Sequence, residues 1–575
     1  MSKFRVSYFF WLGVILGLFA TSVSAGETVT KRAKRLSKDV KIIVTPWGPS
    51  QKETEAAKTR AAQSEAVQNA LRGTKYRLLE FSFIETAEKS SVSEPPTRFR
   101  AVFYDYTNDK AIIAESDFAG KTPVTVREEF YQPTPNDEEF DEAVQILQTD
   151  AKLGAALKSG ALKAFRPMPD VTIQDGTVER LVNVGLSSRT GEQNNEIVSV
   201  SIKRGVVIRY ESGAPAFSKA TPEACGIPAS GQATTANGTA GQSTLTVIVN
   251  NITLWEMLVI RPSASTGTRK SGIEVRDVRY KGKSVLKRGH APVLNVQYNP
   301  QTCGPYRDWQ WQEDMFNAPD AGAQDVAPGI RVLATGQVAT TALESGNDTG
   351  NFRGVAIYFQ NNEAVLVTEM QAGWYRYIME WRFANNGTIR PRYGFGATDN
   401  SCVCNVHNHH VYWRFDFDIV QPNNKVFQIE RGRKFMRPIA TETTLLRNYQ
   451  TNLGLVIQNA NGDEAYSLIP NLSDGRTDTF GVSDLWVLRY KNVVGGTPVQ
   501  NEIDDGFNQT TSQNAFIQIN PFLNNESVDN QDVVVWYAGH FIHNDAANVQ
   551  INPDRSGFIL SGDHVVGPDI RPIRW

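Results

Sequence analysis

The C-terminal part of the chain reads as a long series of short β-strands. From Leu245 to Trp575 apolar and polar residues alternate in short runs separated by turn residues, and helical periodicity is absent. Strands spaced in this way over more than 300 residues favour a large antiparallel β-sandwich. The chain has 575 residues, which is too long for one small core, so we expect more than one domain.

The N-terminus has the pattern of a secretory signal. Residues 1–25 combine Lys3 and Arg5 with an apolar run from Val6 to Ala20 and a small-residue cleavage site ending at Ala25. No other apolar run is long enough to span a bilayer. We therefore expect a secreted or periplasmic protein whose mature form has no membrane span.

Charge and cysteine content limit the kinds of binding partner and the cellular compartment that we expect. Lys and Arg number 59 against 61 Asp and Glu, a net charge of −2, so no overall basic field would hold nucleic acid. Export permits disulfides, and four cysteines allow three pairings. The favoured bridge joins Cys303 to Cys402 or Cys404, and the alternative for Cys402 and Cys404 is to bind a soft metal.

The segments before the β-rich part predict a small α+β domain. Residues 26–75 contain a basic cluster and an Ala/Glu/Lys/Gln-rich helical stretch. Residues 76–212 give three strands, two helices and further strands, an order typical of an α+β domain. The start of residues 213–575 is rich in Gly, Ser, Thr and Pro, which indicates a linker before the β-sandwich.

A pair of histidines marks the first candidate site. His407 and His409 lie two residues apart in an aromatic run with strand alternation, so both side chains point to one face, and His410 points to the other. Imidazole ligands suit copper, zinc, nickel and iron. Solvated or core histidines are the common alternative, because a single pair of this kind is weak evidence for metal.

Several separated segments, taken in order, resemble the copper amine oxidases of the topaquinone type. Gly272–Tyr280 resembles the strand that enters the family's catalytic sandwich, and Arg307–Asp314 resembles the segment that ends in its catalytic base. Tyr375, Trp381 and Gly387 have the spacing that follows the tyrosine processed to quinone. His407 and His409, followed by Arg414 and Asp416, resemble the copper-ligand strand, and Asp532–Trp536 followed by His543 resembles the strand with the third ligand.

The resemblance implies an exported primary-amine oxidase, with a role for each of these residues. Copper would be held by His407, His409 and His543, and Tyr375 would be the precursor of topaquinone. Asp314 would be the catalytic base, with Asp320 as the alternative, and Tyr298 would hold a quinone oxygen. The reaction implied is oxidative deamination of a primary amine by O₂, giving an aldehyde, ammonia and hydrogen peroxide. The family also implies a homodimer.

A second cation site is also implied. Asp416, Asp418 and Asp532, with the carbonyl groups of Phe417 and Val533, resemble the family's peripheral site for a hard cation. Oxygen ligands of this kind suit Ca²⁺ or Mn²⁺. Solvated strand carboxylates are the other interpretation.

The chain departs from the family around the quinone tyrosine. Trp374 stands where the family has Asn, Arg376 replaces an acidic residue, and Gln371 replaces a Thr. Three hypotheses therefore stay open. The chain is an amine oxidase with altered substrate choice, a copper protein with different oxidation chemistry, or a relative that binds metal without catalysis.

Overall fold

The structure is a computed structural model that places most of the chain after the first 38 residues. It describes residues 39–84, 93–133, 135–166, 179–188, 196–208, 226, 241–267, 269–299, 306–313, 324–327, 329–345, 352, 354–398, 401–404, 406–429, 436–447, 454–471, 474, 483–490, 493–494, 497–498, 519, 522–543 and 565–575. The predicted signal in residues 1–25 lies outside these ranges. Among the described residues, no helix is long and apolar enough to cross a bilayer.

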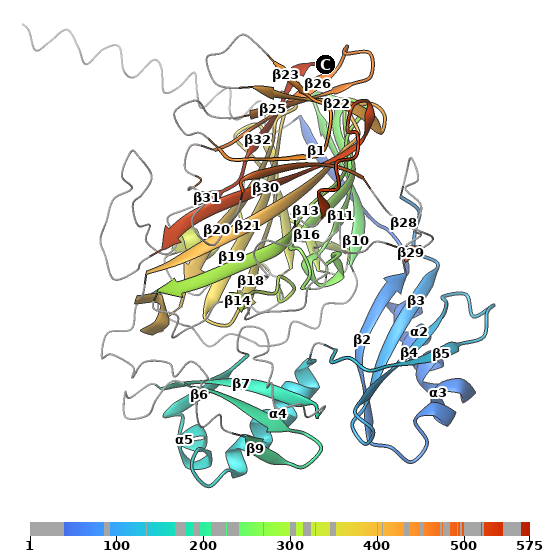
Figure 1. The fold of residues 1–575 in the computed structure, drawn as a ribbon, viewed down its shortest axis with the longest axis vertical. Coiled ribbons are helices and arrows are strands. Elements are labelled where there is room, and N and C mark those ends of the chain that lie inside the picture. Colours follow the sequence, from blue (N-terminus) through green and yellow to red (C-terminus); the bar gives the residue numbers. More distant parts are fainter. Residues whose placement is uncertain are drawn as a thin grey trace, which may run out of the picture.

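One continuous system of 22 strands makes up the large body in Figure 1. Its first layer contains β1 (Val40–Pro46), β10 (Gln242–Val249), β11 (Ile252–Ile260), β12 (Glu274–Tyr280), β13 (Lys283–Asn299), β14 (Tyr306–Arg307), β21 (Val406–Phe417), β24 (Thr443–Leu445), β27 (Leu485–Arg489) and β30 (Gln531–His543).

The second layer contains β15 (Gln324–Ala327), β16 (Ile330–Val332), β17 (Val355–Gln360), β18 (Glu363–Ala372), β19 (Tyr375–Ala384), β20 (Ile389–Ala397), β22 (Asn423–Ile429), β23 (Arg437–Ile439), β25 (Gly454–Asn459), β26 (Ala465–Ile469), β31 (Val565–Val566) and β32 (Asp569–Arg574). The layers meet where β22 pairs with β30. Pairing is antiparallel except between β16 and β17.

The main hydrophobic core lies between the two layers. Val275 and Trp413 come from the first layer, and Leu366, Tyr375 and Trp381 come from the second, and all five are buried in one cluster. Alternation along each strand puts these side chains on the inner face. This arrangement confirms the predicted large, mainly antiparallel β-sandwich.

Two smaller α+β units lie beside the sandwich in Figure 1. The first has α2 (Gln51–Gln63), α3 (Glu65–Ala70), β2 (Tyr76–Ile84), β3 (Arg98–Asp105), β4 (Lys110–Asp117) and β5 (Thr125–Glu129). The second has α4 (Asp137–Thr149), α5 (Gly154–Ser159), β6 (Leu162–Phe165), β7 (Leu181–Ser188), β8 (Glu196–Ser201) and β9 (Val206–Ile208). Minor elements are α6 (Ala342–Ser345), the 3₁₀ turns η1 (Pro262–Ala264) and η2 (Ser401–Cys404), and the hairpin of β28 (Val493–Val494) and β29 (Thr497–Pro498).

The N-terminal segments divide between these bodies. A capping box in which Ser50 and Glu53 bond each other's backbone starts α2, and the buried Ala57 and Ala61 of this helix pack on the first four-stranded sheet. Strand β1 pairs with β10 and so adds to the sandwich. The strands predicted within residues 76–212 form two separate sheets.

Candidate metal centre

The candidate centre is built on two neighbouring strands of the sandwich. Strand β21 pairs antiparallel with β30, and the register sets His407 opposite His543. His409 lies two residues further along β21, on the same face as His407. Strand geometry therefore brings His543 beside two histidines that lie more than 100 positions earlier in the sequence.

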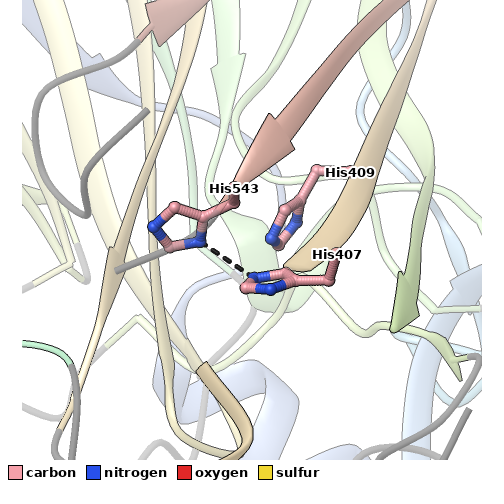
Figure 2. A group of neighbouring side chains, drawn as sticks. All are labelled: His407, His409 and His543. Carbon is pink, nitrogen blue, oxygen red and sulfur yellow. Dashed lines mark hydrogen bonds between the residues drawn. The ribbon is translucent and has the colours of Figure 1, made fainter. Parts of the chain in front are cut away.

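The three imidazoles converge on a common point, as Figure 2 shows. Their candidate ligand nitrogens lie within 4.8 Å of one another, and His407 Nε2 and His543 Nδ1 are 2.9 Å apart. All three rings are buried. Burial, followed by the neighbouring imidazoles, holds the pKa of His409 well below its usual value, so this ring is neutral and available as a ligand.

The hydroxyl of Tyr375 completes the group. Tyr375 is the first residue of β19 in the facing layer, and its ring is fully buried. Its Oη atom lies 3.1 Å from His409 Nε2 and 3.3 Å from His543 Nδ1, and it is in closer contact with His407 Nε2. Three buried imidazoles and one phenol oxygen form a donor set that suits Cu(II). The residues present thus fit the metal that the sequence resemblance implies.

A buried carboxyl group is hydrogen-bonded to a second tyrosine. The ring of Tyr377 stacks on that of Tyr375 with centroids 5.2 Å apart and planes inclined by 2°. Its hydroxyl donates a hydrogen bond to Asp308 Oδ2. Asp308 is fully buried, and burial raises its pKa to about 8, although the bond from Tyr377 acts in the opposite direction.

The segment that was expected to supply the base is described only in part. Asp314 and Asp320 both lie outside the described residues. Tyr298 pairs with His407 in the ladder between β13 and β21, while its side chain is outside the described set. Asp308 was not predicted as a site residue from the sequence, although it lies in the Arg307–Asp314 segment. Its position as a carboxylate between aromatic residues was the sequence signal that could have indicated it.

The two residues that flank Tyr375 have structural contacts of their own. Trp374 is buried, and its ring packs edge-to-face on Phe165 of β6 with centroids 5.9 Å apart. Its carbonyl oxygen accepts bonds from the amide and hydroxyl groups of Thr398. The guanidinium of Arg376 is buried and bonds the Tyr375 carbonyl oxygen at 3.0 Å. Both departures from the family pattern are thus built into the packing.

The carboxylates of the predicted second site also come together. Asp416 and Asp418 are buried, Asp532 is half-buried, and their oxygens lie within 4.8 Å of one another. In the strand register Phe417 lies opposite Val533, which places the two backbone positions beside this cluster. The cysteine pairing stays a prediction, because Cys225 and Cys303 are outside the described residues.

Comparison with solved structures identifies the architecture. No protein-family model matches the chain, and no curated protein matches it in sequence. The chain is similar in structure to a copper-containing benzylamine oxidase from Hansenula polymorpha, with a TM-score of 0.54, 14% identity, and coverage of 92% of this chain and 98% of that one. An Aspergillus nidulans amine oxidase has a TM-score of 0.53 and 14% identity, with coverage of 92% of this chain and 88% of that one. A Pichia pastoris lysyl oxidase has a TM-score of 0.51 and 11% identity, with coverage of 92% of this chain and 90% of that one.

These matches extend over nearly the whole chain and nearly the whole of each relative. At 11–14% identity the likeness concerns the fold. The predicted architecture is therefore confirmed: the chain has the fold of the copper amine oxidases, in a strongly divergent form.

Proposed function

We propose that this chain, which has the fold of the copper amine oxidases, is an exported copper- and quinone-dependent oxidase of primary amines. One observation carries the proposal: the Tyr375 hydroxyl lies at the point where His407, His409 and His543 converge. A tyrosine can be oxidised by O₂ at a redox metal only if its ring reaches that metal. A buried phenol beside three buried imidazoles meets this requirement.

Copper together with a quinone derived from Tyr375 would supply a carbonyl group that captures a primary amine and accepts its electrons. The protein must then remove a proton from the substrate carbon. The sequence resemblance gives this role to Asp314 or Asp320, which lie outside the described residues. Among the described carboxyl groups we assign it to Asp308, because a buried carboxyl group with a pKa near 8 is well suited to accept a proton at neutral to alkaline pH. Tyr377 orients Asp308 through its hydrogen bond and holds the Tyr375 ring by stacking.

Further parts of the proposal follow the fold and the sequence. Substrates would be a primary amine, water and O₂, and products an aldehyde, ammonia and hydrogen peroxide. The signal in residues 1–25 supports secretion or a periplasmic location. The cluster of Asp416, Asp418 and Asp532 would take Ca²⁺ or Mn²⁺, and homodimerisation follows by analogy with the family.

A second candidate function is favoured by Trp374 and Arg376. Their burial beside Tyr375, and the contact of Trp374 with Phe165, leave the ring with different neighbours from those of the family pattern. In this alternative, copper binds to the three histidines but Tyr375 does not become a quinone. The protein would then perform another oxidation or serve only to bind metal.

One reconstitution experiment separates these functions. The full-length protein is prepared without metal, Cu(II) is added in air, and the visible spectrum is followed before phenylhydrazine is added. An absorption band that requires both copper and O₂, and that shifts with the hydrazine, supports the quinone; amines are then screened for hydrogen peroxide release. The matched controls are Zn(II) in air and Cu(II) without O₂. Copper binding without the band would refute the amine oxidase proposal and leave the second candidate.

A further inference from the structure

A second pair of histidines lies directly behind the metal centre. In the ladder between β21 and β30, His410 is opposite His540, just as His407 is opposite His543. Each member of the second pair is three positions from its counterpart, so it projects from the opposite face of the sheet. The two rings have their centroids 4.9 Å apart and are buried. Their face carries a separate apolar cluster that includes Tyr412, Trp486 and Ala538.

The hydrogen bonds of this pair fix both rings. His410 Nδ1 and His540 Nδ1 are 2.6 Å apart, and His540 Nε2 is 3.1 Å from Asp484 Oδ1. A carboxylate only accepts hydrogen bonds, so His540 carries a proton on Nε2. The contact between the two Nδ1 atoms needs one donor and one acceptor, so one proton is held between the rings. The carboxylate thereby orients both rings in succession.

Asp484 is held firmly enough to serve as the anchor. It immediately precedes β27, which pairs with β30. Its backbone amide donates to Leu445, its carbonyl oxygen accepts from Ala538, and its side chain accepts from the backbone amide of Arg447. The guanidinium of Arg447 lies 3.6 Å from Asp484 Oδ1. A residue that does not bind the metal can position the metal ligands when its own contacts are ordered in this way.

We propose that His410, His540 and Asp484 act together as a positioning relay for the metal centre, and this inference rests on the proposed copper function. His543 is the last residue of β30, and strand ends open easily unless another contact holds them. The His410–His540 bond joins β30 to β21 three residues before that ligand. It fixes the register and separation of the two strands, and with them the mutual positions of His407, His409 and His543.

A set of leucine variants tests the relay. His410→Leu and His540→Leu each leave a buried imidazole without its partner and should lower the Tm. The double variant His410→Leu/His540→Leu removes both imidazoles and leaves Asp484 with its contacts to Arg447, so part of the lost Tm should return. A positioning role predicts that Cu(II) affinity, measured by competition with a chelator, nevertheless stays at least about tenfold below wild type in the double variant. Its Cu(II) EPR parameters should also stay shifted.

The controls keep this result interpretable. Val534→Ala lowers stability on the same face of β30, away from the histidines, and should leave the EPR spectrum unchanged. Asp484→Asn keeps the shape of the anchor and should shift the Cu(II) EPR parameters less than the leucine variants do. This variant also provides the test if a leucine variant does not fold. Wild-type EPR and affinity in the double variant would overturn the relay. If wild type itself binds no copper at the three histidines, the proposed function fails instead.

Discussion

At the scale of single residues, the position of the Tyr375 hydroxyl separates metal binding from cofactor formation. Removing this oxygen by Tyr375→Phe leaves the three imidazoles in place, and the ring keeps its stacking on Tyr377. We expect copper binding to persist and the hydrazine-sensitive absorption band to vanish. Metal content and visible spectra after reconstitution in air check this outcome. A band of normal intensity in the variant would mean that another residue carries the carbonyl group.

Asp308 predicts a pH dependence of the reaction. Only the ionised carboxylate accepts a proton, and burial raises the pKa of Asp308 to about 8. The rate should therefore rise with pH through a limb near pH 8, and Asp308→Asn should lower it by about 10²–10⁴-fold. The profiles of wild type and variant are compared with the same amine, so that titration of the substrate is common to both. Retention of the limb near pH 8 in Asp308→Asn would assign it to another group.

The same residue predicts a pH dependence of stability. The folded-state pKa of Asp308 lies above its usual value, so the folded protein binds the proton more tightly than the unfolded chain. Its contribution is present at low pH and is lost as pH rises from about 4 to about 8, by at most about 1.4 kcal/mol per pH unit. The difference in Tm between Asp308→Asn and wild type should thus grow in favour of the variant from pH 5 to pH 8. Asp463→Asn, which changes an exposed carboxylate, serves as the control.

At the scale of strands, close packing between the layers depends on Gly289 of β13. A Cβ atom at this position would lie 2.7 Å from Cη2 of Trp381 on β19. The indole cannot easily move, because its Nε1 donates to the carbonyl oxygen of Ile273 and its ring packs edge-to-face on Trp413. Gly289→Ala should therefore destabilise the protein by about 1–3 kcal/mol, as measured by denaturant unfolding. Adding Trp381→Phe should recover part of the loss, and failure to do so would locate the strain elsewhere.

Strand periodicity explains which parts of the site could be predicted from the sequence. A period of two placed His407 and His409 on one face and His410 on the other, and the structure has them so. Periodicity says nothing about which distant strands become neighbours. The bond between Tyr377 and Asp308 joins positions 69 residues apart, and the His410–His540 contact joins positions 130 apart. Sheet order and register create these pairs, and no local sequence pattern predicts them.

At the scale of the whole molecule, the sequence indicated the mainly β architecture but not the division of the N-terminal part. The Ala-rich segment of α2 reads as a helix from its composition alone. Its packing on the sheet of β2–β5, and the separation of β6–β9 into another sheet, depend on burial between segments that are far apart. Propensity identifies an element, whereas tertiary contacts decide the body to which it belongs.

The second α+β unit reaches the sandwich beside Tyr375. Phe165 at the end of β6 packs on Trp374, and Arg166 lies over the ring of Trp311 at 5.4 Å. Tyr375 is fully buried, so a reagent that attacks its ring must displace covering groups. We expect the Phe165–Trp374 contact to be one such cover, because Trp374 directly precedes Tyr375 in the chain, and an aromatic pair of this type contributes about 0.5–1.5 kcal/mol.

Phe165→Ala should therefore open the approach to the cofactor. Loss of a contact of this size corresponds to an increase of up to about tenfold in the rate constant for capture by phenylhydrazine. Stopped-flow absorbance on the copper-reconstituted protein measures that constant. Phe81→Ala provides the matched control, because it removes an aromatic contact with Phe99 within the first α+β unit. An unchanged rate in Phe165→Ala would mean that the second α+β unit supports the sandwich without restricting entry to Tyr375.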